Sequence, residues 1–122
     1  MKLHLAKIDG QNAFTGYGSG YVLVNGSRHE RSLIVLAGRL VENWGVARIE
    51  ELAEADVGVF AGLGVEILLL GTGQSLRFPP PRLLQPLAAA GTGVEVMDTP
   101  AACRTYNILL AEGRNVAAAL IL

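Results

Sequence analysis

The sequence predicts an α/β protein in which helices pack against one mixed β-sheet. Three observations lead to this fold class. The amino-terminal half contains short apolar runs joined by turn residues, which is typical of an antiparallel meander. The carboxyl-terminal half alternates apolar runs with segments of helical periodicity, which predicts a βαβαβ arrangement with parallel strands. The strongest apolar run, VEILLLGT at residues 65–72, suits a strand buried on both faces of the sheet.

The composition is typical of one compact domain over residues 1–122. Hydrophobic residues make up 51% of the chain and charged residues 17%, so much of it must be buried in a core or against another subunit. The formal net charge is −1 and the Lys and Arg residues are scattered, whereas a nucleic-acid surface needs clustered basic residues. We therefore expect a single domain and no nucleic-acid partner.

The sequence contains no recognisable signal for export or membrane insertion. Its first residues, MKLHLAKIDG, lack the apolar core of a signal peptide and the Arg-rich amphipathic character of a mitochondrial presequence. No apolar stretch approaches the roughly twenty residues of a transmembrane helix. We expect a cytoplasmic protein that does not insert stably into a membrane.

Cysteine and histidine are too scarce for a disulfide or a zinc site. Cys103 is the single cysteine and therefore has no intramolecular disulfide partner. We interpret it as a buried small hydrophobe, with a reactive thiol as the alternative. His4 and His29 fall on separate expected strands without a triad-like acid or serine, so we expect neither a metal site nor a hydrolase triad.

The amino-terminal half begins with an expected strand at residues 3–8 and a polar, glycine-rich link at residues 9–20. Phe14 and Tyr17 lie within that link. Because they are large and aromatic, we expect their side chains to fold back onto the core.

A hairpin follows this link. A strand at Tyr21–Val24 leads into Asn25 and Gly26, a pair that favours the positive φ angles of a type I′ turn. The returning strand is expected at residues 28–36, and another short strand at residues 39–44. The latter ends at the single tryptophan, Trp44, which we expect in the core rather than at an exposed interface.

Helical periodicity begins after Gly45. Apolar residues recur on one side, at Ile49, Leu52, Ala53, Val57 and Phe60. Acidic residues gather near the amino end, where the helix dipole favours them, at Glu50, Glu51, Glu54 and Asp56. We expect a helix of roughly ten residues that ends near Gly62 or Gly64.

The segment at residues 78–91 is rich in proline. The three prolines at 79–81 can open a helix at its first turn, whereas Pro86 would remove a helical hydrogen bond. Either the helix is kinked, or its regular part starts close to Gln85. Gly91 is a natural stop.

The last part of the chain reads as strand, helix and strand. A short strand is expected at residues 94–97 and a final one at residues 116–122. Between them, Asp98 is a capping residue and Pro100 suits the first helical turn. The helix has an apolar stripe and ends at Gly113; the stripe consists of Ala102, Cys103, Tyr106, Leu109 and Leu110.

Two groups of residues form a candidate ligand site, because consecutive parallel strands bring their following loops to one edge of the sheet. The first group is the loop after residues 65–70, whose backbone N–H groups could hold a small anion or carbonyl. The second is the start of the helix after residue 97. The candidate residues are Gly71, Thr72, Gly73, Gln74, Arg77, Asp98, Thr99 and Arg104.

Each group also has a purely structural interpretation. The glycines of the loop permit a tight turn and close helix packing, and Leu76 replaces the third glycine of a dinucleotide fingerprint, so no nucleotide cofactor is expected. Asp98 and Thr99 are first of all capping residues. Arg104 near the positive end of a helix either pairs with Asp98 or awaits an anionic group. Thr105 and Asn107 either line the same rim or are solvated.

Two carboxyl-terminal blocks carry a family resemblance: ILLLGTGQSLRFPPPRLL at residues 67–84 and GVEVMDTPAACRTYNILLAEGRNVAAALI at residues 93–121. Together with the Gly-Tyr-Gly segment at 16–18 and Trp44-Gly45, they resemble the domain-of-unknown-function family 498, which includes relatives of mitochondrial complex I assembly factor 3 and the adipogenesis-associated cytosolic protein. The resemblance implies a three-layer α/β fold with a central mixed sheet. The mitochondrial members look like non-catalytic assembly factors for a membrane enzyme, and this chain resembles a bacterial-type cytosolic member.

Two functions follow as expectations. The leading one is a non-catalytic binding or assembly-type protein with a protein partner, a homodimer included, and with no catalytic residues, cofactor or metal. The alternative is a small-molecule or anion-binding protein, or an enzyme, whose site is the candidate edge. A closed Asp98–Arg104 pair would favour the first and an open one the second.

Overall fold

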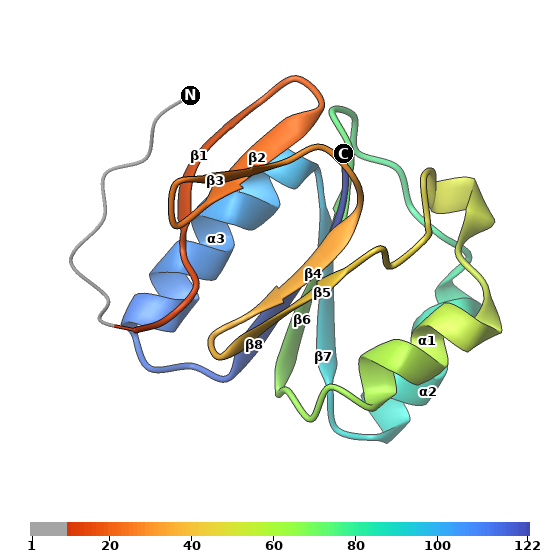
Figure 1. Ribbon diagram of the computed structural model, residues 1–122. Coiled ribbons are helices and arrows are strands. Elements are labelled where there is room, and N and C mark those ends of the chain that lie inside the picture. The colour runs from red at the N-terminus through yellow and green to blue at the C-terminus, as the bar shows by residue number, and fades with distance from the viewer. Residues whose placement is uncertain (1–9) are drawn as a thin grey trace.

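The computed structural model describes residues 10–122, in which strands form two sheets and helices cover both faces of the larger one (Figure 1). The strands are β1 (Phe14–Gly18), β2 (Tyr21–Val24), β3 (Ser27–His29), β4 (Leu33–Leu36), β5 (Arg39–Glu42), β6 (Ile67–Thr72), β7 (Gly93–Met97) and β8 (Val116–Ile121). The helices are the 3₁₀ turn η1 (Ile49–Glu51), α1 (Glu54–Ala61), α2 (Pro81–Ala89) and α3 (Thr99–Ala111). The strand expected at residues 3–8 lies outside the described residues.

The smaller sheet is antiparallel, with the order β1-β2-β3. Asn25 and Gly26 have φ angles of 50° and 84°, so the predicted hairpin turn is confirmed. Strand β1 falls where a link was expected, and that part of the prediction is wrong. Phe14 and Tyr17 nevertheless do bury their side chains, as predicted, because β1 places them against the core.

The larger sheet has the order β5-β4-β8-β6-β7. Strands β6, β7 and β8 run parallel, whereas β4 pairs antiparallel with both β5 and β8, so the predicted mixed sheet is confirmed. The expected single strand at residues 28–36 is divided between the sheets, since the polar residues Glu30 and Arg31 are exposed and interrupt the pairing. The strands of the meander therefore belong to two sheets rather than one.

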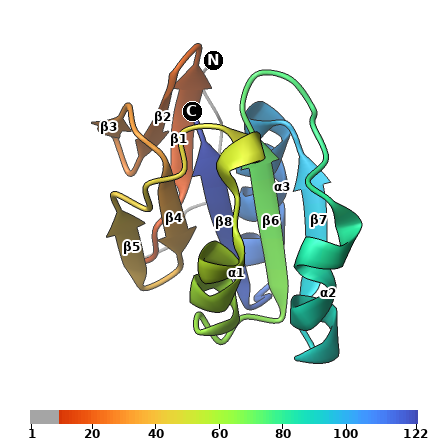
Figure 2. The same cartoon turned by 90° about the vertical axis from the view of Figure 1, so that its right-hand side faces the viewer.

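The larger sheet is the middle of three layers (Figure 2). One face packs against α3 and the smaller sheet, through residues such as Phe14, Leu69 and Tyr106. The other face packs against η1, α1 and α2, through residues such as Phe60 and Leu70. Alternate residues of the central strands point into each layer, which is why these strands are apolar throughout.

The central strand β8 is unusual in its small side chains. All six of its residues are buried, between β4 on one side and β6 on the other. Ala118 faces the layer that contains α3, and Ala117 and Ala119 face the layer that contains α1. Methyl groups at the centre of the sheet let both layers approach it closely.

The helix expected after Gly45 is split into η1 and α1, with Leu52 in an extended conformation between them. The break is stabilised by Asp56, whose Oδ2 accepts a hydrogen bond from the N–H of Ala53 at 2.9 Å. Gly62 caps α1, as expected. Trp44 is buried with its ring centroid 5.3 Å from that of Phe60, which confirms its place in the core.

Helix α2 excludes one of the two alternatives for the proline-rich segment. It begins at Pro81 and continues through Pro86 to Ala89, so the start near Gln85 is wrong. Gly91, with a φ of 86°, ends it in the predicted place.

Candidate functional site

The two groups of the candidate site meet at the carboxyl edge of the larger sheet. Strands β6 and β7 are neighbours in parallel register, with Gly71 opposite Met97. Beyond them, the N–H of Thr99 donates to the carbonyl of Gly73 at 2.8 Å, and the N–H of Gly73 donates to Oγ1 of Thr99 at 2.9 Å. The predicted meeting of the loop with the start of α3 is therefore confirmed.

Thr99 connects the start of α3 to the loop after β6 and to the end of β8. Its side chain is 2% exposed, and Oγ1 also donates to the carbonyl of Ile121 at 2.6 Å. A Cβ at Gly71 would lie only 2.9 Å from that oxygen, so this glycine is needed for close packing of α3 on β6. Gly73 has a φ of 99°, which favours glycine. The structural interpretation of these two glycines is correct, and the N–H of Gly73 is already bonded.

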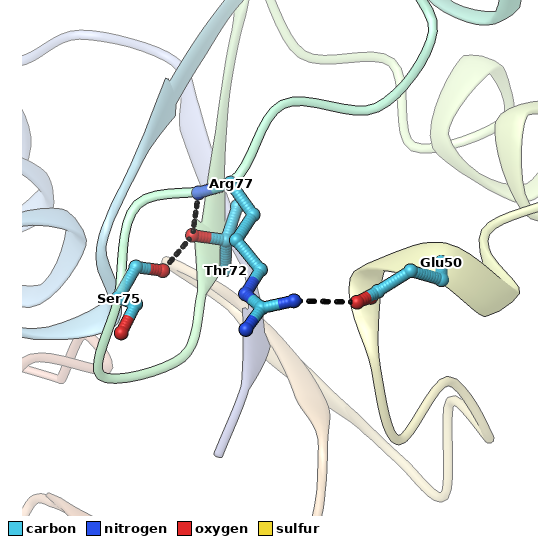
Figure 3. A network of polar contacts seen from close by, with 4 residues as sticks. All are labelled: Glu50, Thr72, Ser75 and Arg77. Carbon is cyan, nitrogen blue, oxygen red and sulfur yellow. Dashed lines mark hydrogen bonds and ion pairs between the residues drawn. The ribbon is translucent and has the colours of Figure 1, made fainter.

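The remainder of the loop forms a second polar network (Figure 3). Oγ1 of Thr72 donates to the carbonyl of Ser75 at 2.7 Å and accepts from the N–H of Arg77 at 3.1 Å. The side chain of Arg77 extends to η1, where Nη1 donates to Oε1 of Glu50 at 2.9 Å. Both partners of this ion pair are exposed, so its contribution to stability is small, about 0–1 kcal/mol.

A pocket of about 250 Å³ opens beside this network. Thr72, Gly73 and Arg77 line it together with Arg48 and Glu50 of the segment around η1. The other candidates do not line it: Gly71, Gln74, Asp98, Thr99 and Arg104. Sequence reasoning missed Arg48 and Glu50 because their position depends on how η1 folds over the end of β8.

Asp98 acts as the predicted cap of α3, since Oδ1 accepts from the N–H of Ala101 at 2.8 Å. Arg104 does not pair with it. Nη1 of Arg104 donates instead to the hydroxyl of Tyr17 at 2.6 Å, and the guanidinium carbon lies 5.7 Å from the centroid of that ring. Of the two alternatives for Arg104, the ion pair with Asp98 is thus wrong, and by this criterion alone the open pair would favour a ligand site. Arg104 is nevertheless held by Tyr17, so it connects α3 to β1 rather than facing a ligand.

Asn107 was expected at the rim or in solvent, and it is in fact 4% exposed. Its Oδ1 accepts from the N–H of Phe14 at 2.9 Å and its Nδ2 donates to the carbonyl of Phe14 at 2.8 Å. The side-chain amide therefore continues the edge of β1. Its spacing from Cys103 and Leu110, four and three residues, is a signal that places it on the buried face of the helix.

Burial controls the titration of two groups of α3. It raises the pKa of the Cys103 thiol from its ordinary value of 9.0 to about 12, although the charge of Arg104 acts in the opposite direction. Burial likewise raises the pKa of Tyr106, whose hydroxyl donates to the carbonyl of Asn12 at 2.8 Å. The interpretation of Cys103 as a buried small hydrophobe is confirmed.

His29 lines another pocket of about 350 Å³, in the region of the β3–β4 connection. Its Nδ1 lies 3.5 Å from Oε1 of Glu42, which is long for a hydrogen bond. Between residues 10 and 122, no group of three or more His, Cys, Asp and Glu side chains is placed to hold a metal ion. His4 lies outside the described residues.

Apolar groups are exposed near the candidate edge. Leu76 and Phe78, in the connection from β6 to α2, are 51% and 71% exposed. A groove of about 920 Å³ lies between α1 and α2 and begins at Pro80, two residues beyond Phe78. Across the described part of the chain, no helix combines the length and the apolar character needed to cross a bilayer.

Comparison with known proteins places the chain among widely distributed relatives. Residues 14–121 match the model of a family described as a protein of unknown function, DUF498/DUF598. The 13 kDa major membrane protein of Francisella tularensis subsp. holarctica is 30% identical over 122 residues, which cover 99% of each chain. A crystal structure of a Bordetella parapertussis protein matches with a TM-score of 0.86 and 41% identity, over 94% of this chain and 98% of that one.

A bovine relative is longer than this chain. The NADH dehydrogenase (ubiquinone) 1 alpha subcomplex assembly factor 3 of Bos taurus is 36% identical over 107 residues. The match covers 86% of this chain but only 58% of the bovine protein. The resemblance stated from the sequence blocks is confirmed.

Proposed function

Since the chain belongs to the DUF498/DUF598 family, and since several relatives are named as complex I assembly factors, we propose that it is a non-catalytic binding protein that assists the assembly of a protein complex. One contrast carries the proposal. The polar groups of Thr72, Gly73 and Thr99 are already hydrogen-bonded within the protein, whereas Leu76 and Phe78 of the same connection are exposed to solvent. A surface of this kind suits a protein partner more than a reaction.

The place of action that we propose is the cytoplasm, with a partner that belongs to or matures into a membrane complex. Such a role accommodates both names among the relatives, the membrane protein and the assembly factor. A second copy of the chain is one candidate for the partner, because charged residues make up only 17% of the sequence.

Affinity purification from a lysate of the source organism, combined with light scattering, tests the proposal. We expect a defined partner to be recovered, and a Phe78→Asp substitution to reduce its recovery at least tenfold. Ile108→Asp is the matched control, because Ile108 is also apolar and 59% exposed but lies on α3, in the opposite layer. A strictly monomeric chain that recovers no partner would contradict the proposal.

The alternative is a small-anion site in the pocket beside η1. The observation in its favour is that Arg48 and Arg77 both line this pocket, together with Thr72. Its volume of about 250 Å³ is smaller than is usual for metabolite pockets, so phosphate or a short carboxylate is the expected class. This hypothesis ranks second because Glu50 already neutralises Arg77.

A thermal-shift series with inorganic phosphate, sulfate and short carboxylates distinguishes the two functions. An anion site predicts a rise in melting temperature that Arg48→Ala abolishes. Arg104→Ala is the comparison, since Arg104 is bonded to Tyr17 and does not line the pocket. No shift with any of these anions would remove the alternative.

A further inference from the structure

The groove between α1 and α2 has a continuous wall on its α1 side. Glu54, Val57, Gly58 and Ala61 line it, and their spacing of three, four and seven residues puts them on one face of the helix. Gly58 and Ala61 are small, and a Cβ built at Gly58 would meet nothing within 4 Å. The middle of this wall is therefore open space, into which another backbone can approach closely.

The opposite wall comes from the start of α2. Pro80, Leu83 and Pro86 give it a rigid apolar surface, and Arg82 lies at its rim. Pro86 has no N–H to donate to the carbonyl of Arg82, so the regular hydrogen bond of the helix is missing at this wall.

The rims carry opposite charges. Glu54 is exposed at the start of α1 and Arg82 is exposed in the first turn of α2. Among the ion pairs between described residues, which include Arg77–Glu50 and Arg114–Glu66, neither Glu54 nor Arg82 takes part. Each rim therefore offers an uncompensated charge to an occupant.

We propose that this groove binds an amphipathic α-helix of a partner protein. The helix carries basic side chains on the edge that faces Glu54, acidic side chains on the edge that faces Arg82, and small or aliphatic residues between them. This inference rests on the proposed function and adds to the exposed Leu76 and Phe78 a second contact surface, with its own partner chemistry. Helix α1 has eight residues, so its wall is about 12 Å long and matches about two turns of a bound helix.

The groove favours a helix over the other common occupants. An added strand needs a free sheet edge, and the residues that line this groove come from the η1–α1 segment and the start of α2. Polyproline segments bind grooves lined by aromatic rings, and this groove is lined by aliphatic residues and prolines. A membrane surface attracts clustered basic residues, whereas the rims carry one acid and one arginine.

A displayed library of 18-residue amphipathic helices, with an alanine and leucine face and randomised flanking positions, provides the test. Selection on the intact chain should enrich helices with Lys or Arg on one edge and Asp or Glu on the other. Gly58→Trp should weaken their binding at least tenfold by filling the groove. Gly38→Trp is the matched control, because Gly38 also has open space around it but lies in the β4–β5 turn.

Charge exchange gives a second readout. A variant with both Glu54→Arg and Arg82→Glu should prefer helices whose edge charges are reversed. The inference is overturned if no helix is enriched, if the selected helices bind Gly58→Trp as tightly as the parent chain, or if their preference ignores the charge exchange. Binding to phosphatidylglycerol vesicles that Gly58→Trp abolishes would also overturn it, in favour of a membrane surface.

Failure of this inference is distinguishable from failure of the proposed function. If a native partner is recovered equally by the parent chain and by Gly58→Trp, the groove is the wrong site but the binding function stands. If no partner is recovered by either chain, the function fails, while the helix selection still decides whether the groove accepts a helix. Melting temperatures of each variant establish that it is folded.

Discussion

The hydroxyl group of Thr99 joins three segments that are distant in sequence. It accepts from the N–H of Gly73, donates to the carbonyl of Ile121, and belongs to the first residue of α3. Since the hydroxyl group is buried, water cannot replace its hydrogen bonds to the N–H of Gly73 and the carbonyl of Ile121.

Replacing Thr99 by valine should therefore be costly. The side chains have nearly the same shape, but valine leaves the N–H of Gly73 without its acceptor and the carbonyl of Ile121 without its donor, which costs about 2–3 kcal/mol. Urea unfolding measures the change, with Thr99→Ser expected closer to the parent. Thr105→Val on the same helix is the control, with an expected effect within about 0.5 kcal/mol. Equal stability of the parent and Thr99→Val would contradict this role.

Alkaline pH should destabilise the fold through Cys103. Its pKa is raised by burial to about 12, so between pH 9.0 and 12 the unfolded chain releases a proton that the folded chain keeps. The contribution of this group to stability is constant well below pH 9.0 and falls as the pH rises, approaching a loss of about 1.4 kcal/mol per pH unit about one unit above that value. Urea unfolding at pH 8, 9 and 10 measures the slope. Between pH 9 and 10, Cys103→Ala should lose about 1 kcal/mol less stability than the parent chain, and equal losses would contradict the prediction.

Residues whose roles are local could be predicted from the sequence. Asp98 caps the helix that follows it, and Asn25-Gly26 forms its own turn. The roles of Arg104 and Asn107 could not be predicted from the sequence, because their partners in β1 lie 87 and 93 positions away. No local pattern indicates which distant strand a helix will meet.

At the scale of elements, α1 contains a glycine that its conformation does not require. Gly58→Ala should stabilise the protein by about 0.5–1 kcal/mol, because alanine has the higher helix propensity and its Cβ meets no atom within 4 Å. Gly64→Ala should have the opposite effect, since Gly64 has a φ of 69°. Thermal unfolding of both variants measures the difference. A stabilising Gly64→Ala, or a destabilising Gly58→Ala, would contradict the described helix.

The elements that sequence reasoning missed are those with weak local signals. Strand β1 has the sequence FTGYG, whose two glycines indicate a loop, and it forms a strand because Phe14 and Tyr17 pack against α3. The expected strand at residues 28–36 is apolar only from Leu33 onward, and its division between two sheets follows from the polar residues before it. Tertiary packing decided the first case, and the polar interruption decided the second.

At the scale of the whole molecule, Asn107 fastens the smaller sheet to α3. Asn107→Asp should detach this sheet, because it removes the donor to the carbonyl of Phe14 and buries a carboxyl group. We expect a loss of about 2–4 kcal/mol and faster hydrogen exchange in β1 and β2 than in β6 and β8. Hydrogen exchange read by mass spectrometry checks this. An equal increase of hydrogen exchange in both sheets would contradict the prediction that Asn107 stabilises the smaller sheet in particular.

The overall order of the carboxyl-terminal strands and helices could be predicted because βαβ units allow few topologies. The residues that line the pocket beside η1 could not be predicted from the sequence. This pocket combines the loop after β6 with a segment near η1 that precedes β6 in the chain. That juxtaposition depends on how the third layer closes over the sheet.

The alanines of β8 have a consequence for how related sequences can diverge. Neighbouring positions of this strand are constrained from opposite sides, Ala118 by the α3 layer and Ala117 and Ala119 by the layer of α1. A larger side chain at position 118 would have to be compensated within α3 or β1, and one at position 117 or 119 within α1 or α2. Substitutions at adjacent sites of this strand should thus co-vary with residues of different layers. Position 118 should vary with the α3 layer, and positions 117 and 119 should vary with the layer of α1.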